Sequence, residues 1–241
     1  MFAPPCESEG QHQPRQYMAN ELETNWQFHT TPTLGQGSQI RRAVALDCEM
    51  GVAESGESEL IRVTVVDYFS CEVLVDKLVW PDVKMNHYNT RFSGVTRQAM
   101  HDARRTKSCL FGRNNARRAV CKFVGPDTIV VGHGVQQDLT SLRWIHPQLI
   151  DTLLVERGKR NREEKYQGVD VVDEESQQIE RTKPAGGGLS LKALAMHRLN
   201  RLIQSKKKGH DNLEDSIATR DILHWNVVQA LMLKTQSSES I

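Results

Sequence analysis

The sequence has no long hydrophobic run, and neither a cysteine framework nor a secretory leader is expected from it. No stretch approaches the roughly 18–20 consecutive apolar residues needed to span a bilayer, which excludes a transmembrane protein, and no membrane partner is expected. The five cysteines are odd in number, scattered and without a CxxC pair. This pattern argues against a disulfide framework or a Cys-rich zinc site and favours a reducing, intracellular compartment. The opening residues MFAPPCESEG lack a basic region followed by an apolar run, so secretion is not expected.

The sequence also has almost no net charge, because 31 Lys and Arg oppose 30 Asp and Glu. Net charge alone therefore gives no argument for a nucleic-acid partner, and only the distribution of charge can supply one. The 241 residues, of which 38% are hydrophobic, are enough for one domain with its own core, plus tails.

Composition divides the chain into an arm, a domain and a tail. Residues 1–38 are rich in Pro, Gln, Ser, Thr and Gly without a sustained period, which predicts a flexible N-terminal arm whose Trp26 and Phe28 could pack on the body. The domain is expected over 39–236, with a polar surface insertion at 156–188 and a tail at 237–241.

Within the domain, β-type runs come first and helical patterns follow. Three runs separated by turn residues predict an antiparallel meander, and two later apolar runs predict buried strands joined by helices. This order predicts an α/β protein with a mixed sheet and helices on its faces. The expected strands are 43–50, 60–69, 72–80, 127–134 and 149–155, and the expected helices are 95–104, 112–124, 136–144, 189–199 and 213–234.

Two acidic residues lie at the end of the first strand of this pattern. Asp47 and Glu49 are two positions apart on an extended segment, so their side chains project from the same face. Two adjacent carboxylates that lose hydration repel each other, and a divalent cation removes both penalties. The alternative is that the strand simply ends in solvent at these residues.

Two further groups of polar residues lie where strands or loops meet helices. Asp138 follows a predicted strand, and taken alone it is an acidic residue favoured at a helix start. In GHDNLEDS (209–216), a loop places His210 five residues before Asp215, although Asp211 or Asn212 could instead serve as a helix cap. Together the four carboxylates suit Mg²⁺ or Mn²⁺, and a neutral His210 could deprotonate an attacking water.

These segments resemble a known family. LDCEMG, TRFSGVT, VGHGVQQDL, IDTLL, GLSLKALA and GHDNLEDSIATRDI occur in order between about residues 41 and 234. They are similar to the DEDDh 3′–5′ exonucleases, and most similar to the branch of the Rex and interferon-stimulated RNA exonucleases. The resemblance implies a DnaQ-type, RNase H-like fold with a mixed five-stranded sheet and helices on both faces.

The resemblance also implies the chemistry. Asp47, Glu49, Asp138 and Asp215 would bind two Mg²⁺ (or Mn²⁺) ions, and His210 would act as general base. An in-line attack would release nucleoside 5′-monophosphates from the 3′ end of single-stranded RNA. DNA 3′ ends remain an alternative substrate, because the carboxylates do not distinguish the two sugars. A nucleic-acid-binding module without turnover is the alternative from a different class.

Substrate contacts are expected beside the catalytic set. Met50 and Gly51 follow the first carboxylate pair, where an apolar residue can stack beneath a base and a small one permits close approach. Lys206, Lys207 and Lys208 lead to His210 and suit phosphate binding. Phe92 could also stack on a base, but we predict that its ring packs in the core. The resemblance, more than the basic runs, implies a nuclear location, with the cytoplasm as a second one.

Overall fold

A computed structural model describes residues 21–33, 39–167, 188–205 and 209–238 of the chain. Residues 239–241 of the predicted tail, most of the N-terminal arm, residues 168–187 of the insertion and the three lysines at 206–208 lie outside the described residues. The first two residues of the predicted tail, 237 and 238, continue the C-terminal helix, so the tail begins later than predicted. Among the described helices, none is both long enough and apolar enough to cross a membrane.

The centre of the molecule is a mixed sheet whose first three long strands form the predicted antiparallel meander. β2 pairs with β3 and β3 with β4 in antiparallel fashion, while β7 runs parallel to β2 and β9 parallel to β7. These five strands are those expected from the sequence, and two short strands at the margins bring the sheet to seven. The strands are β1 (His29–Thr30), β2 (Ala43–Ala53), β3 (Ser58–Asp67), β4 (Val73–Trp80), β5 (Met85–His87), β6 (Leu110–Phe111), β7 (Ile129–Gly132), β8 (Trp144–Ile145) and β9 (Leu149–Asp151).

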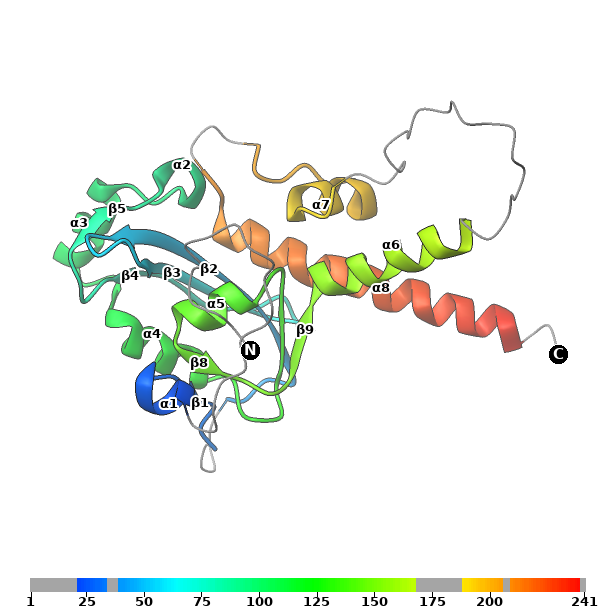
Figure 1. The fold of residues 1–241 in the computed structure, drawn as a ribbon, viewed down its shortest axis with the longest axis horizontal. Helices are drawn as coiled ribbons and strands as arrows, with labels where there is room; N and C mark the ends of the chain where they lie inside the picture. The colour runs from blue at the N-terminus through cyan, green and yellow to red at the C-terminus, as the bar shows by residue number, and fades with distance from the viewer. Residues whose placement is uncertain (1–20, 34–38, 168–187, 206–208, 239–241) are drawn as a thin grey trace.

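Helices cover both faces of the sheet, as the α/β pattern predicts (Figure 1). The C-terminal helix α8 crosses the sheet over β2, β3 and β7 and then extends beyond it, with α6 alongside. The helices are α1 (Glu21–Asn25), α2 (Thr90–Ser93), α3 (Arg97–Arg105), α4 (Gly112–Cys121), α5 (Gln136–Ser141), α6 (Thr152–Gln167), α7 (Leu191–Leu199) and α8 (Asn212–Ser238).

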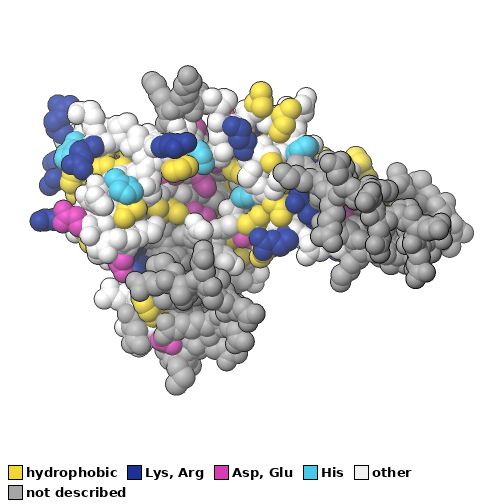
Figure 2. Space-filling model, turned by 45° about the horizontal axis from the view of Figure 1, so that its top comes forward, with side chains coloured by type: hydrophobic (Ala, Val, Ile, Leu, Met, Phe, Trp, Pro, Cys, Tyr) yellow, Lys and Arg dark blue, Asp and Glu magenta, His cyan; other side chains and the backbone are white. Residues whose placement is uncertain are grey.

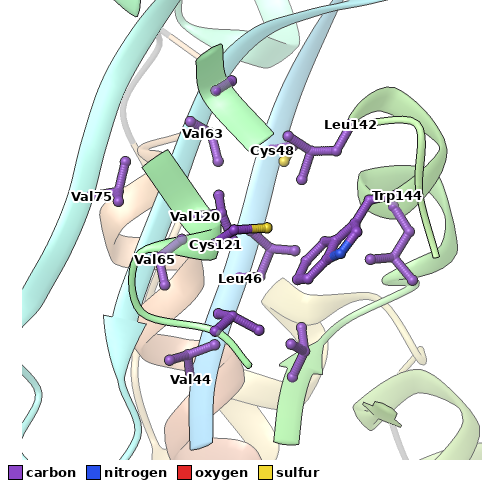
Figure 3. Packing of buried hydrophobic residues seen from close by; sticks show 14 of the residues in the cluster. Val44, Leu46, Cys48, Val63, Val65, Val75, Val120, Cys121, Leu142 and Trp144 are labelled. Atoms are coloured by element: carbon purple, nitrogen blue, oxygen red, sulfur yellow. The ribbon is translucent and has the colours of Figure 1, made fainter. Parts of the chain in front are cut away.

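The alternation of side chains along β2 separates the core from the site. Val44, Leu46 and Cys48 point to one face, where they pack with Val63 and Val65 of β3 and with buried residues of α4 and α5 (Figure 3). Burial of this apolar surface is the main source of the stability of the sheet. The alternate residues of β2, including Asp47, project to the opposite face of the sheet, which α8 covers.

Residues 21–33, which the sequence assigns to the N-terminal arm, include a helix and a short strand that pack on the domain. β1 pairs in parallel with β8, and the indole Nε1–H of Trp144 donates to Oγ1 of Thr31 at 2.9 Å. Phe28 is buried. The predicted packing of Phe28 on the body is thus confirmed. The predicted flexibility does not hold for residues 21–33, because paired backbone groups and this buried ring hold them against the domain.

The region after β9 also differs from the prediction. The strand expected over 149–155 ends at Asp151, and helix α6 begins at Thr152. The Asp151 carboxylate accepts a hydrogen bond from the backbone N–H of Leu153 at 2.9 Å, as a helix-capping residue does. α6 then continues through 156–167, so the first part of the predicted insertion is helix.

Candidate active site

The site is built where β2 passes beneath the start of α8. Asp47 pairs with Thr64 and Glu49 with Arg62 in one unbroken register, so the two carboxylates share a face of the sheet as predicted. The register shifts only after Glu49, between this residue and Met50. The extra residue at this point is Ile61 of β3, which has no partner on β2, so the irregularity lies opposite the end of the acidic pair.

The third carboxylate reaches β2 from α5. Asp138 is buried, and its Oδ1 accepts a hydrogen bond from the backbone N–H of Cys48 at 2.9 Å. The turn before α5 is fixed by Asp151, whose carboxylate also accepts from the backbone N–H of Gly134 at 2.9 Å. Asp138 is thus hydrogen-bonded to Cys48, which lies between Asp47 and Glu49, and its carboxylate belongs to the same acidic group.

The fourth carboxylate comes from the first turn of α8, which is tied to β2 by a buried amide. Nδ2 of Asn212 donates to the backbone carbonyl of Asp47 at 3.1 Å and to Oγ1 of Thr64 at 2.9 Å. This contact holds the helix start over the acidic strand. Asp215, one turn further along, is buried at 3% exposure and faces the same space.

His210 lies at the open side of this group. Its side chain is 38% exposed, and its Nδ1 lies 3.5 Å from Oδ2 of Asp215. Its backbone N–H donates to the carbonyl of Phe92 at 2.6 Å, which attaches the loop to α2. One ligand atom each from Glu49, His210 and Asp215 lie within 4.8 Å of one another.

The pKa values of the four carboxyl groups are raised, because the nearby positive charge is too small to compensate for their burial and mutual repulsion. Burial raises the pKa of Asp47 and of Asp138 well above their usual values, and neighbouring carboxylates raise both further. Burial, with the charge of Asp215, raises the pKa of Glu49 to about 8. Burial also raises the pKa of Asp215. Arg62 lowers the pKa of the β2 pair only in part, because its guanidinium is held by Asp76 at 2.9 Å.

The donor set fits a divalent cation. Carboxylate oxygens predominate in it, which is the ligand type that Mg²⁺ and Mn²⁺ prefer. Among the described residues, no group donates a hydrogen bond to Oδ1 of Asp215, although this atom is buried. A buried carboxylate oxygen without a donor is costly unless a cation binds it.

The five residues proposed from the sequence for catalysis therefore lie together, although the elements that carry them are far apart in the chain. Figure 2 shows acidic side chains in a recess on one face, bordered by histidine, Lys or Arg and hydrophobic side chains. Met50, half-buried, packs at the edge of the core beside this group, and its carbonyl accepts from Nδ2 of Asn89 at 3.2 Å. The substrate contacts predicted at Lys206, Lys207 and Lys208 lie outside the described residues.

Two expectations about substrate contacts need correction. A Cβ at Gly51 would lie 2.6 Å from Cε of Met85 and 2.8 Å from the carbonyl oxygen of His87, so the missing side chain makes room for β5 rather than for a nucleotide. Phe92 is 60% exposed, so the prediction of core packing is wrong. It lies on the short α2 turn beside His210, with the guanidinium of Arg91 5.7 Å from the centre of its ring.

Several residues that organise the site carried no signal in the sequence. The sequence predicts at most a helix-capping role for Asn212, yet its amide joins α8 to β2. The sequence pattern assigns Asp151 to a strand, and it gives no indication that the amide of Gln204 lies 3.0 Å from Oδ2 of Asp215. The NLEDS pattern after Gly209 marked the region of Asn212, but not its partner strand.

No protein-family model matches the sequence. RNA exonuclease 3 of Candida albicans is 31% identical over 211 residues, which cover 88% of this chain and 43% of that protein. Apoptosis-enhancing nuclease of Rattus norvegicus is 34% identical over 200 residues, which cover 82% of this chain and 52% of that protein. The chain thus spans about half the length of these curated relatives.

The fold is also similar to solved structures. The Saccharomyces cerevisiae Pan2 pseudoubiquitin hydrolase–RNA exonuclease module in complex with AAGGAA RNA matches with a TM-score of 0.55 and 19% identity, over 92% of this chain and 33% of that one. The catalytic unit of Neurospora crassa Pan2 matches with a TM-score of 0.58 and 19% identity, over 88% of this chain and 31% of that one. At this level of identity the likeness concerns the fold.

Proposed function

Because this chain belongs to the DnaQ-like exonuclease family, we propose that it is a metal-dependent 3′–5′ exonuclease that acts on single-stranded RNA. The observation that carries the proposal is the convergence of four carboxylates from β2, α5 and α8 beside a solvent-accessible histidine. RNA is the proposed substrate class because several curated relatives are named RNA exonucleases and the yeast Pan2 module is solved with bound RNA.

The residues that would hold the metal are Asp47, Glu49, Asp138 and Asp215. Two Mg²⁺ or Mn²⁺ ions, when bound, would stabilise charge on the attacking and leaving oxygens of the phosphodiester. The raised pKa values of these carboxylates follow from burial and mutual repulsion, and a bound cation favours their ionised form.

His210 would be the general base. It stands on a loop at the open side of the carboxylates, where its ring reaches water, and its backbone is anchored to Phe92. From this position it would accept the proton of the attacking water, and the carboxylate of Asp215 beside Nδ1 would stabilise the imidazolium that forms. Bond cleavage would then release a nucleoside 5′-monophosphate.

Two exposed residues beside the base are suited to guide the 3′ end into the site. Phe92 presents an aromatic face to solvent, and Arg91 next to it carries a positive charge. Aromatic stacking together with phosphate neutralisation is the usual way in which proteins hold single strands without reading their sequence. Met50 and Lys206–Lys208 remain further predicted contacts.

The proposal is tested by a time course on 5′-labelled single-stranded RNA and matched DNA, with Mg²⁺, Mn²⁺ or EDTA. A ladder that shortens from the 3′ end, and is lost with EDTA or in Asp47→Ala, is the expected result. Faster cleavage of the DNA would contradict the assignment of RNA. Intact substrate under every metal condition, with RNA binding that Asp47→Ala leaves unchanged, would instead establish a binding module without turnover.

We also propose the nucleus as the main location, with the cytoplasm as a second one. The proposal rests on the family resemblance and on the Lys206–Lys208 run. Microscopy of a tagged chain, compared with one in which the three lysines are replaced by glutamine, tests the contribution of that run. Unchanged nuclear staining in the variant would contradict it.

A further inference from the structure

The side-chain amide of Gln204 is hydrogen-bonded to one of the proposed metal ligands. Its Nε2 donates to Oδ2 of Asp215 at 3.0 Å. Gln204 lies in the loop between α7 and α8, outside the element that carries Asp215. It has no part in the proposed reaction itself, so its contact with the acidic group needs a separate explanation.

The loop holds the backbone of Gln204 firmly. Its N–H donates to Oε2 of Glu214 at 2.9 Å, and its carbonyl accepts from Nζ of Lys192 at 3.3 Å. The preceding residue, Ile203, is fully buried between α7 and α8. Gln204 itself has a φ of 53°, which few non-glycine residues adopt without surrounding contacts that impose it. The amide is thus presented to Asp215 from a fixed point.

The two oxygens of Asp215 have different surroundings. Oδ2 accepts from Gln204 and lies 3.5 Å from Nδ1 of His210. Oδ1 is buried and accepts no hydrogen bond from any described residue. A carboxylate held by one oxygen in this way cannot turn freely about its last torsion, so the other oxygen stays in one direction.

We propose that Gln204 is a positioning residue, which holds Asp215 by Oδ2 and so keeps Oδ1 in place for a divalent cation. The amide nitrogen of glutamine only donates, so this bond suits the ionised carboxylate and remains when a cation binds the opposite oxygen. Partners of this kind, one step removed from the metal, orient the ligands and typically change metal affinity or activity by 10–100-fold. The inference rests on the proposed function, because it assigns Asp215 to the metal.

The test compares Gln204→Met with Ile203→Val. The methionine keeps the length of the side chain and removes its donor. The Ile203→Val change loosens the same loop without touching a polar group. For both variants and the unaltered chain, calorimetry measures the Kd of Mn²⁺ alone, thermal unfolding gives Tm, and cleavage of 5′-labelled single-stranded RNA gives kcat and KM over a range of Mn²⁺ concentrations.

Gln204→Met is expected to weaken Mn²⁺ binding by about tenfold or more and to need correspondingly more Mn²⁺ for half-maximal kcat, with KM for RNA unchanged. Ile203→Val is expected to lower Tm while the Kd of Mn²⁺ stays within twofold of that of the unaltered chain. An unchanged Kd in Gln204→Met, or an equal weakening in Ile203→Val, overturns the positioning role.

Measurements on the unaltered chain distinguish a failure of this inference from a failure of the proposed function. If it cleaves RNA in Mn²⁺ and Gln204→Met binds Mn²⁺ equally well, only the role of Gln204 is overturned. If the unaltered chain neither binds Mn²⁺ nor releases nucleotides, the proposed function is overturned, and the role of Gln204 with it.

Discussion

Gly209 lies directly against the backbone of Gly94, so closely that a Cβ on Gly209 would come within 2.3 Å of the Gly94 nitrogen. This contact joins the loop that carries His210 to the α2 turn. Gly209 also has a φ of 91°, a conformation that side chains rarely adopt. The position of the proposed base therefore depends on the absence of a side chain one residue before it.

Gly209→Ala is expected to displace His210 and lower kcat by at least about tenfold, because catalysis is sensitive to small displacements of its groups. It should also lower the free energy of unfolding by about 1–3 kcal/mol through backbone strain. Gly56→Ala is the matched control, because Gly56 has a φ of 87° with open space around it. That variant should lose stability and keep its kcat; an equal loss of kcat in both would contradict the placement argument.

His210→Ala is expected to lower kcat on RNA by about 10²–10⁴-fold near neutral pH, the usual contribution of a general base. The loss of Mn²⁺ affinity should be smaller than in Asp47→Ala, because the carboxylates remain. His224→Ala removes an exposed histidine about 13 Å beyond Asp215 along α8 and should leave kcat unchanged. Full activity of His210→Ala at neutral pH would remove the general-base assignment.

Asp47→Asn is expected to lower kcat by about 10³-fold or more, equivalent to about 4 kcal/mol of transition-state stabilisation. The metal-free variant should unfold at a higher temperature than the unaltered chain, because one member of a repelling, buried group loses its charge. Asp127→Asn, at an exposed site, should change neither quantity. A lower Tm in metal-free Asp47→Asn would argue against the repulsion.

The raised pKa of Glu49, about 8, predicts how stability depends on pH without metal. The folded state keeps the proton to higher pH than the unfolded state, so it binds more protons between the usual pKa of about 4.5 and about 8. The stability that protonated Glu49 contributes is therefore lost as pH rises through this window.

Thermal unfolding in EDTA at pH 5, 6, 7 and 8 tests this, with Glu49→Gln as the comparison. The Tm advantage of Glu49→Gln over the unaltered chain should grow as pH rises, and excess Mn²⁺ should reduce it at pH 8. Glu57→Gln, at an exposed site, is the control. A constant difference in Tm across these pH values would show that Glu49 ionises normally.

Phe92→Ala is expected to raise KM for single-stranded RNA by about tenfold with a smaller change in kcat, because stacking on one base contributes about 1–3 kcal/mol. Phe92→Tyr should retain the KM of the unaltered chain. Phe69→Ala removes another exposed phenyl ring, at the turn between β3 and β4, and should have no effect. An unchanged KM in Phe92→Ala would exclude stacking at this position.

The local sequence pattern was sufficient to predict structural features that depend on a single segment of the chain. The period of two along β2 predicted that Asp47 and Glu49 share a face, and this holds because the register stays regular until Glu49. The alternating runs of β3 and β4 likewise predicted the meander. The helix start at Thr152 was missed, because an apolar run such as LIDTLLV suits either a strand or a helix and only the cap at Asp151 decides between them.

Contacts between distant segments could not be predicted in this way. Asn212 contacts Thr64 across 148 positions, and nothing in either segment marks the other as its partner. The exposure of Phe92 depends on how the α2 turn packs against the loop of His210. The resemblance to a family supplied the proposed catalytic residues, whereas the residues that position them could be identified only from the fold.

The hydrogen bond between Asn212 and Asp47 spans 165 positions, and it has a consequence for synthesis of the chain. Chains emerge from the ribosome N-terminus first, at about 5–20 residues per second. The β2 carboxylates are therefore made early, while His210 and Asp215 arrive only with the last of the described helices. The proposed nuclease centre is therefore incomplete in a nascent chain until α8 has docked, and messenger RNA at the ribosome would not meet the full set of proposed catalytic residues while most of the domain is being made.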